Sequence, residues 1–308
     1  MTIRDKRQEQ FANIWMDHGR FGILNLCPRF GKIRTTINIL DRFEYNQHIL
    51  IAYPDNKIKQ AWIDEFELMG YKNENVMYTT HRSLHKHVDT WDIIIIDEIH
   101  LLSPAQREVC QELFEKNLYV LGLTGTLSKW TKRDLRLELG IEVMAEYTIQ
   151  EAIKEGVITD YEITVIQVPL DNTVINEYTK KKIKKTELQQ FNFLSSQINK
   201  MMYTGANTMF HRLARMRIIQ NSVSKLNKTK EILTGNPDER ILVFCGITKI
   251  ADALGIPSHH SKSKDKEAFN RFAEGEGNHM AVVKIGNTGV TYKPLNKVII
   301  NYFDSNAE

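Results

Sequence analysis

The stretch Trp91-Asp92-Ile93-Ile94-Ile95-Ile96-Asp97-Glu98-Ile99-His100 is an apolar run that ends in two acids and a histidine. Four consecutive isoleucines without polar alternation predict a strand buried on both faces, as in the middle of a parallel α/β sheet. Ligands of such sheets gather at the carboxyl ends of the strands. At that end, Asp97 is suited to hold Mg²⁺ and Glu98 to orient a water that attacks a phosphoryl group. The alternative is that the two acids only end a strand before a helix that starts near Ser103.

Composition indicates a globular protein of two ordinary domains. The chain has 308 residues, of which 42% are hydrophobic and 26% charged, and its net charge is +3. Because the charge is nearly balanced, any affinity for nucleic acid must come from local basic patches. Cys27, Cys110 and Cys245 lie far apart, which argues against a disulfide framework or a zinc site and favours the cytoplasm. The sequence shows no signal peptide and no membrane-spanning segment, so we expect no membrane partner.

A phosphate-binding loop is predicted near the N-terminus. Phe21 to Leu26 is typical of a short buried strand, and it runs into Cys27-Pro28-Arg29-Phe30-Gly31-Lys32-Ile33-Arg34-Thr35-Thr36 and then a helix. Helix N-terminal amides and a lysine can together bind the β and γ phosphates of a nucleotide. The usual pattern differs in two places, because its first glycine is absent and Ile33 replaces the hydroxyl that binds Mg²⁺. A simple turn with a surface lysine is the alternative.

The next segments repeat a strand followed by a helix. Strands are expected at His48 to Tyr53, Val76 to Thr80 and Leu118 to Leu123, besides the isoleucine strand. Five such units in about 130 residues predict a doubly wound parallel sheet. The histidine-rich residues 81–87 have no acid or cysteine at ligand spacing, so a solvated loop is favoured over a metal site.

The order of these motifs resembles the first RecA-like domain of a superfamily-two helicase, in the branch of repair translocases and restriction motor subunits. The resemblance implies ATP and Mg²⁺ as cofactors. It places catalytic roles on Lys32, Asp97, Glu98 and His100, the last three in a DEAH-like box, with Asp97 as the metal ligand. An R-x-x-Q match makes Gln10 the adenine-binding candidate together with Arg7. The remaining nucleotide-binding candidates are Pro28, Arg29, Phe30, Gly31, Lys32, Ile33, Arg34 and Gly289.

The same resemblance predicts where a nucleic acid is bound, through its backbone rather than its bases. In the family, the segments that follow the second and third β-strands contact the nucleic acid. A segment matched here by T-G-T couples nucleotide state to domain closure. The nucleic-acid candidates are Pro54, Asp55, Asn56, Thr80, Arg82, Thr124, Thr126 and Thr288. DNA is favoured over RNA, because the closest motif pattern is that of repair and recombination motors.

A second RecA-like domain is expected from 161 to 308, after a first domain from 1 to 160. A short helix within 147–158 should precede a strand from Tyr161 to Val168 and a long helical region at 172–233. That region carries Lys180-Lys181-Lys182-Ile183-Lys184-Lys185, which is either a solvated helix face or a track for nucleic acid. Aromatic residues interleave with it, and core packing explains them at least as well as base stacking.

Strands of the second domain are expected at 240–245, 258–260, 280–285 and 298–303. Residues 286–291 occupy the place of the family's motif V but lack its usual acids. The arginine-bearing motif VI would follow the last residue, so the second domain looks incomplete at its C-terminus. An arginine finger can contribute a factor of about 10³ to 10⁵ to turnover. Arg34 and the arginines of 212–217 are the alternative sources.

These observations favour an ATP-dependent helicase or translocase that moves along DNA in repair, recombination or replication, in the cytoplasm, or in the host cytoplasm where a phage encodes it. A nucleic-acid-binding scaffold that has lost hydrolysis is the second hypothesis, because of Ile33, Asn287 and Thr291. A P-loop ATPase with a protein client is the third. Protein partners cannot be read from the sequence.

Overall fold

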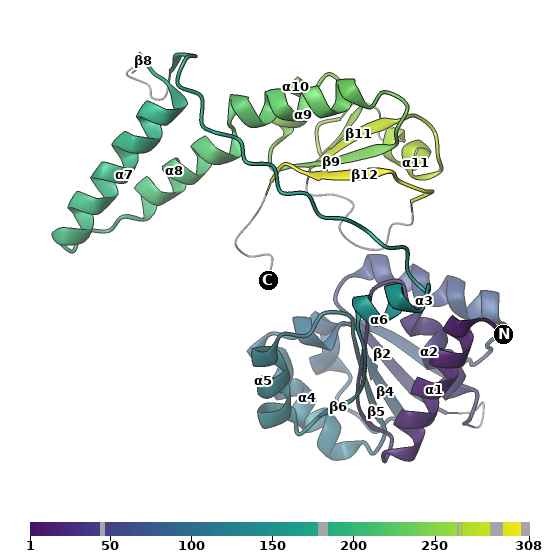
Figure 1. Ribbon diagram of the computed structural model, residues 1–308. Helices are drawn as coiled ribbons and strands as arrows, with labels where there is room; N and C mark the ends of the chain where they lie inside the picture. The colour runs from purple at the N-terminus through teal and green to yellow at the C-terminus, as the bar shows by residue number, and fades with distance from the viewer. Residues whose placement is uncertain (44–46, 178–183, 264, 266, 284–291, 303–308) are drawn as a thin grey trace. The chain divides into compact units, whose positions relative to one another are not determined.

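The computed structural model describes residues 1–43, 47–177, 184–263, 265, 267–283 and 292–302. The chain divides into two compact units, Met1–Ile163 and Thr164–Glu308 (Figure 1). The sequence placed this division at residues 160 and 161. Both units are α/β with parallel sheets, so the prediction of two RecA-like domains in tandem is confirmed.

The N-terminal unit contains a parallel sheet of six strands in the order β3-β2-β4-β5-β1-β6. The predicted isoleucine strand, β4, lies inside this sheet, where Ile95 pairs with Ile51 of β2 and Leu121 of β5. All four isoleucines are buried, as their unbroken apolar run predicts. The strands are β1 (Phe21–Leu26), β2 (Ile49–Tyr53), β3 (Val76–Thr80), β4 (Ile93–Ile96), β5 (Val120–Thr124) and β6 (Val143–Tyr147).

Helices cover both faces of this sheet, with α1, α2 and α3 on one side and α4 and α5 on the other (Figure 1). Side chains cap several of the helix starts, as where Thr2 and Asp5 form a capping box at the start of α1. The helices are α1 (Ile3–Asp17), α2 (Lys32–Leu40), α3 (Asn56–Met69), α4 (Pro104–Lys116), α5 (Lys129–Leu139) and α6 (Ile149–Lys154), with short 3₁₀ helices η1 (His81–Lys86) and η2 (Ile99–Leu101).

The C-terminal unit contains a parallel sheet of four strands in the order β10-β11-β9-β12. α9 and α10 pack on one face of it and α11 on the other. The elements are α9 (Val223–Gly235), β9 (Ile241–Cys245), α10 (Thr248–Ala253), β10 (Ser258–His259), α11 (Ala268–Ala273), β11 (His279–Val283) and β12 (Lys297–Ile300).

The region before this sheet differs from the sequence prediction. The strand expected at Tyr161 to Val168 is wrong, because residues 159–171 form neither helix nor strand and Val165 is exposed. Apolar alternation makes a strand only where a neighbour supplies hydrogen bonds, and no described strand pairs with this segment. The helical region begins later than predicted, at α7 (Glu187–Tyr203), which is followed by α8 (Met209–Gln220). Before α7, the short strands β7 (Asn176–Glu177) and β8 (Lys184–Lys185) pair in antiparallel fashion.

No helix within the described parts of the chain is both long and apolar enough to span a bilayer.

Candidate nucleotide-binding site

The connection from β1 to α2 has the geometry of a phosphate-binding loop. Gly31 is the residue before α2 and has φ +100°, a conformation that side chains rarely adopt. A Cβ atom there would also lie 2.4 Å from the side-chain nitrogen of Gln8, so only glycine fits. Arg29 has φ +63° in the same loop. The loop therefore turns sharply into the helix N-terminus, where unpaired backbone amides and the helix dipole favour an anion.

Gln8 of α1 forms hydrogen bonds with the backbone of this loop. Its side chain is buried, and its Nε2 donates to the carbonyl oxygen of Phe30 at 2.9 Å. The second, longer contact runs to the carbonyl of Gly31 at 3.5 Å. No described residue donates a hydrogen bond to Gln8 Oε1, which leaves an acceptor beside the loop. From the sequence, Gln10 rather than Gln8 was predicted to bind adenine.

Asp97 lies just past the end of β4, and its carboxylate is held by two donors. Its side chain is 6% exposed. Trp62 Nε1, from the fully buried indole of α3, donates to Oδ2 at 3.1 Å. The backbone N–H of Glu98 donates to Oδ1 at 3.0 Å. Burial raises the pKa of Asp97, whereas Lys32 nearby lowers it. The carboxylate thus has a fixed orientation at the end of the strand.

Glu98 connects the loop lysine to a histidine and a threonine. It has φ +49°, a strained backbone for a residue with a side chain. Its carboxylate forms an ion pair with Lys32 Nζ, and its other oxygen lies 3.4 Å from Nδ1 of His100. The same Nδ1 is 2.9 Å from the hydroxyl of Thr124 at the end of β5. Burial lowers the pKa of His100, although Glu98 raises it.

A second histidine contacts the other side of Asp97. His81 begins η1 directly after β3, and its Nε2 donates to the backbone carbonyl of Asp97 at 2.9 Å. Burial lowers the pKa of His81 to about 4, so the ring is neutral at pH 7. Its neighbours Thr80 and Arg82 are two of the predicted nucleic-acid contacts. The sequence analysis missed His81 and Trp62, because only folding brings α3 and the end of β3 beside the end of β4.

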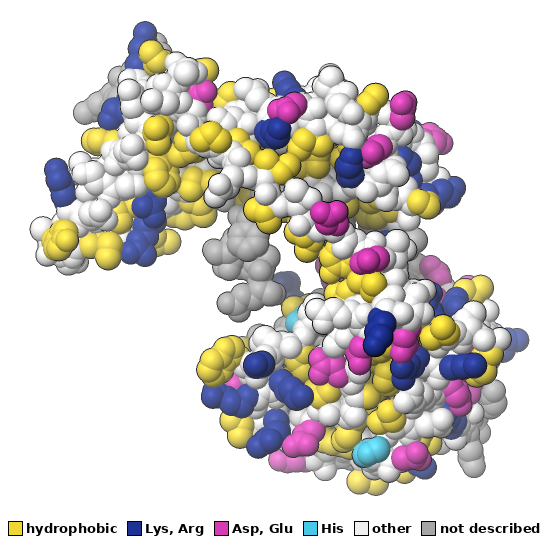
Figure 2. All heavy atoms as spheres, viewed as in Figure 1, with side chains coloured by type: hydrophobic (Ala, Val, Ile, Leu, Met, Phe, Trp, Pro, Cys, Tyr) yellow, Lys and Arg dark blue, Asp and Glu magenta, His cyan; other side chains and the backbone are white. Residues whose placement is uncertain are grey.

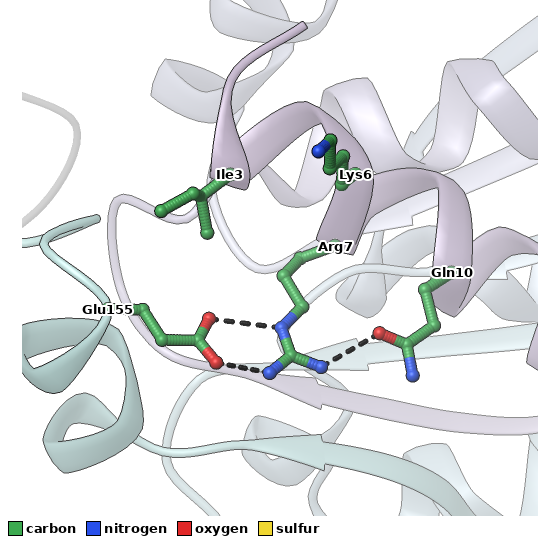
Figure 3. A pocket seen from close by; sticks show the side chains of 5 residues that line it. All are labelled: Ile3, Lys6, Arg7, Gln10 and Glu155. Carbon is green, nitrogen blue, oxygen red and sulfur yellow. Dashed lines mark hydrogen bonds and ion pairs between the residues drawn. The ribbon is translucent and has the colours of Figure 1, made fainter.

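An open pocket lies beside α1 and is lined by Ile3, Lys6, Arg7, Gln10 and Glu155 (Figure 3). Arg7 forms a two-pronged ion pair with Glu155 and donates from Nη1 to Gln10 Oε1 at 2.8 Å. The hydroxyl of Tyr147 donates to the same Glu155 carboxylate at 2.8 Å. The pair lowers the pKa of Glu155, with the Arg7 hydrogen bond as the main cause. Gln10 is thus exposed, and its side-chain oxygen is turned toward Arg7 (Figure 3).

The structure therefore brings together Lys32, Asp97, Glu98, His100 and Thr124, at the carboxyl ends of β1, β4 and β5. Thr124 was predicted to contact nucleic acid, yet its side chain is fully buried and its hydroxyl is occupied by His100.

The other predicted residues lie around this centre. Pro28 lies beside Gly125 of the predicted T-G-T segment, where an added Cβ would be 3.4 Å from the proline ring. Arg34 is ion-paired with Glu65 of α3. Pro54, Asp55 and Asn56 follow β2 at the start of α3, and Thr126 is exposed after β5. Thr288 and Gly289 lie outside the described residues.

The residues present fit the phosphates of a nucleotide, but the usual set of ligands for Mg²⁺ is incomplete. The loop, its helix amides and Lys32 fit a polyphosphate. Asp97 supplies one carboxylate, which suits an ion that keeps several waters. Ile33 supplies no oxygen where a hydroxyl is usual. Among the described residues, no cluster of three or more His, Cys, Asp or Glu side chains is placed to hold a metal.

Comparison with known proteins supports the fold. Neither a family model nor a curated protein matches the sequence. Among solved structures, the Pyrococcus furiosus Hef helicase domain aligns with 98% of this chain and 91% of its own, at TM-score 0.54 and 14% identity. The Sulfolobus solfataricus SWI2/SNF2 ATPase core in complex with dsDNA aligns with 96% and 80%, at TM-score 0.41 and 15% identity. The UvsW helicase from bacteriophage T4 aligns with 46% and 58%, at TM-score 0.36 and 19% identity. The first of these likenesses, to the Hef helicase domain, shows that the chain has a helicase-like fold.

Proposed function

We propose that this chain is an ATP-dependent motor that moves along nucleic acid, with DNA favoured over RNA. The observation that carries the proposal is the ion pair between Lys32, at the N-terminus of α2, and Glu98, directly after the buried strand β4. Two elements far apart in sequence thus bring a lysine ammonium beside a carboxylate, a pair suited to bind a phosphate and to act as a base. The fold likeness to the Hef helicase domain is consistent with this assignment.

The residues divide the work of ATP hydrolysis. Lys32 exchanges its Glu98 partner for the γ-phosphate, which frees the Glu98 carboxylate to accept a proton from the attacking water. The phosphoryl group passes to that water, and ADP and phosphate leave. A magnesium ion held through Asp97 would neutralise part of the phosphate charge. His100 contacts both Glu98 and Thr124, so a change in the position or protonation of the Glu98 carboxylate can be transmitted to the end of β5.

The test is steady-state ATP hydrolysis with Mg²⁺, alone and with single-stranded, duplex and forked DNA and with RNA. Glu98→Gln is expected to abolish hydrolysis while retaining ATP binding, and Lys32→Ala to lose binding. Glu108→Gln makes the same change on the exposed surface of α4 and should hydrolyse ATP at the normal rate. If the wild-type protein hydrolyses ATP no faster than Glu98→Gln with every nucleic acid, the proposed motor function is refuted.

A nucleic-acid-binding scaffold without hydrolysis is the second candidate, and Ile33 is the observation that favours it. In that case DNA binding would be the same with and without ATP, and it would be unaffected by either Glu98→Gln or Lys32→Ala. Nucleotide-dependent DNA affinity that disappears in Lys32→Ala would exclude the scaffold.

A further inference from the structure

The segment that precedes the second sheet carries a concentrated positive charge. Residues 172–220 contain nine of the 41 Lys and Arg residues of the chain but two of its 38 Asp and Glu residues. One of these two acids, Glu187, is buried. Its carboxylate accepts hydrogen bonds from the Ser222 hydroxyl at 3.0 Å, from Asp171 N–H at 3.2 Å and from Val223 N–H. It therefore holds three segments together and is not available to neutralise surface lysines or arginines.

Two helices of this segment, α7 and α8, pack on each other, and we refer to them as the helical hairpin (Figure 1). Arg215 Nη1 of α8 donates to the Ser195 hydroxyl of α7 at 3.2 Å. Within the described chain, the exposed Lys200, Arg212 and Arg217 of this hairpin form no ion pair. Elsewhere in the protein, cations such as Arg107 and Lys297 do. No acidic side chain among the described residues thus neutralises these three cations.

The end of the hairpin also exposes large apolar side chains. α7 ends at Tyr203 and α8 begins at Met209, so both ends meet at the short connection between them. Tyr203 is 93% exposed and Phe210 is 78% exposed, and Met202 and Met209 are more than half exposed beside them. Figure 2 shows hydrophobic and basic side chains together over this hairpin. Folding gains nothing from rings left in water, so these aromatic side chains are suited to contact a ligand.

We propose that the end of the helical hairpin binds single-stranded nucleic acid. Unpaired bases stack on Tyr203 and Phe210, while Lys200 and Arg212 contact the adjacent phosphates. Base stacking on aromatic side chains combined with a basic surface is how strands are held without sequence preference. A duplex keeps its base faces stacked inside and cannot offer them to these rings. An apolar protein partner would leave the unneutralised cations unused, whereas a polyanion with flat bases uses both features. The choice of nucleic acid as ligand rests on the proposed function.

Binding is measured without nucleotide, by fluorescence anisotropy of a labelled 20-nucleotide oligodeoxythymidylate and of a duplex of the same length. Tyr203→Ala/Phe210→Ala is expected to weaken single-strand binding at least tenfold, since each stacked base contributes a factor of about five or more. Duplex binding should change little. Tyr203→Trp/Phe210→Trp should retain tight binding. The matched control is Trp130→Ala/Leu137→Ala, which removes two comparably exposed apolar side chains from α5.

The charged part of the site has its own control. Lys200→Ala/Arg212→Ala should reduce the slope of log affinity against log salt by about 1.4, the value for two lost contacts to a single strand. Lys72→Ala/Lys116→Ala removes the same charge from the exposed surface of the other unit and should leave the slope unchanged. Light-induced crosslinking of a bromodeoxyuridine strand should label the peptide that contains Tyr203 or Phe210.

Two outcomes separate this proposal from the motor, and two more test the hairpin site alone. If wild type hydrolyses ATP with DNA stimulation but the ring variants bind like their control, the hairpin site is wrong and the motor stands. If no nucleic acid stimulates hydrolysis but the ring variants weaken binding, the site stands and the motor is wrong. Equal loss of duplex and single-strand binding in the ring variants would also refute base stacking. A hairpin that binds a protein instead would leave both affinities at control values.

Discussion

Replacing Trp62 by Phe should destabilise the N-terminal unit by removing one hydrogen bond to a buried carboxylate. The smaller ring still packs against Phe66, but Asp97 Oδ2 loses its donor at 3.1 Å. A hydrogen bond to a charged group contributes about 1.5–3 kcal/mol, and the lost part of the indole costs roughly 1 kcal/mol in packing. The expected loss in the free energy of unfolding is therefore about 2.5–4 kcal/mol.

Trp15 offers the matched control. It is fully buried like Trp62, but its indole N–H donates to the neutral backbone oxygen of Val120 at 3.2 Å. Because a neutral hydrogen bond contributes about 0.5–1.5 kcal/mol, Trp15→Phe should cost about 1 kcal/mol less than Trp62→Phe. All four tryptophans of the chain lie in the N-terminal unit, so tryptophan fluorescence during urea unfolding reports this unit alone.

The decisive comparison repeats both substitutions in an Asp97→Asn background. Without the carboxylate charge, the extra cost of Trp62→Phe should largely disappear, whereas the cost of Trp15→Phe should stay the same. Equal costs for the two tryptophans in the protein with the native Asp97 would refute the reasoning. An extra cost for Trp62→Phe that persists unchanged in the Asp97→Asn background would show that packing, not the hydrogen bond to a charge, is responsible.

Three further substitutions test the site. Gln8→Ala should weaken ATP binding about fivefold or more and reduce the preference for ATP over GTP in equilibrium binding, while Gln10→Ala should change neither. The reverse result would support Gln10, the adenine-binding residue predicted from the sequence. His81 has its pKa lowered to about 4 in the folded protein, so below its ordinary value near 6.5 the unfolded chain binds more protons. Stability should fall as the pH drops from 6.5 to 4, by up to about 3 kcal/mol, and less steeply in His81→Gln when unfolding is measured across that range. Thr124→Val removes the hydroxyl beside His100 at nearly constant volume, and nucleic-acid-stimulated hydrolysis should fall about two- to tenfold with ATP affinity unchanged; equal rates would mean that this contact has no part in coupling.

Features set by local periodicity were readable from the sequence, and those set by pairing were not. The isoleucine run predicted β4 correctly because a strand buried on both faces needs no partner pattern to be recognised. β6 was missed, since Val143–Tyr147 contains exposed Glu146 and is only partly buried at the edge of the sheet. The strand at Tyr161 to Val168 was wrong for the opposite reason: its alternation is strand-like, but no described strand lies beside it.

The choice between Gln8 and Gln10 shows a signal that the sequence did contain. A helix turns about 100° per residue, so glutamines two positions apart point to nearly opposite sides. Phe11, Ala12 and Trp15 are buried and mark the core-facing side of α1. Gln8 precedes them by three, four and seven residues and lies on that side, where the phosphate loop packs, whereas Gln10 does not. The R-x-x-Q match alone does not indicate which side of the helix the glutamine faces.

Asp97 receives hydrogen bonds from elements that no sequence motif joins to it. Trp62 fixes its carboxylate, while His81 fixes its backbone carbonyl at 2.9 Å. His81 is flanked by Thr80 and Arg82, where a nucleic-acid strand is predicted to bind. A shift of that segment on binding a strand must therefore either stretch a buried hydrogen bond or move the Asp97 backbone. Because Glu98 is the next residue and is already in a strained conformation at φ +49°, even a small movement of Asp97 changes where the Glu98 carboxylate points. For the proposed motor, this gives a physical reason for nucleic acid to control hydrolysis from within the N-terminal unit.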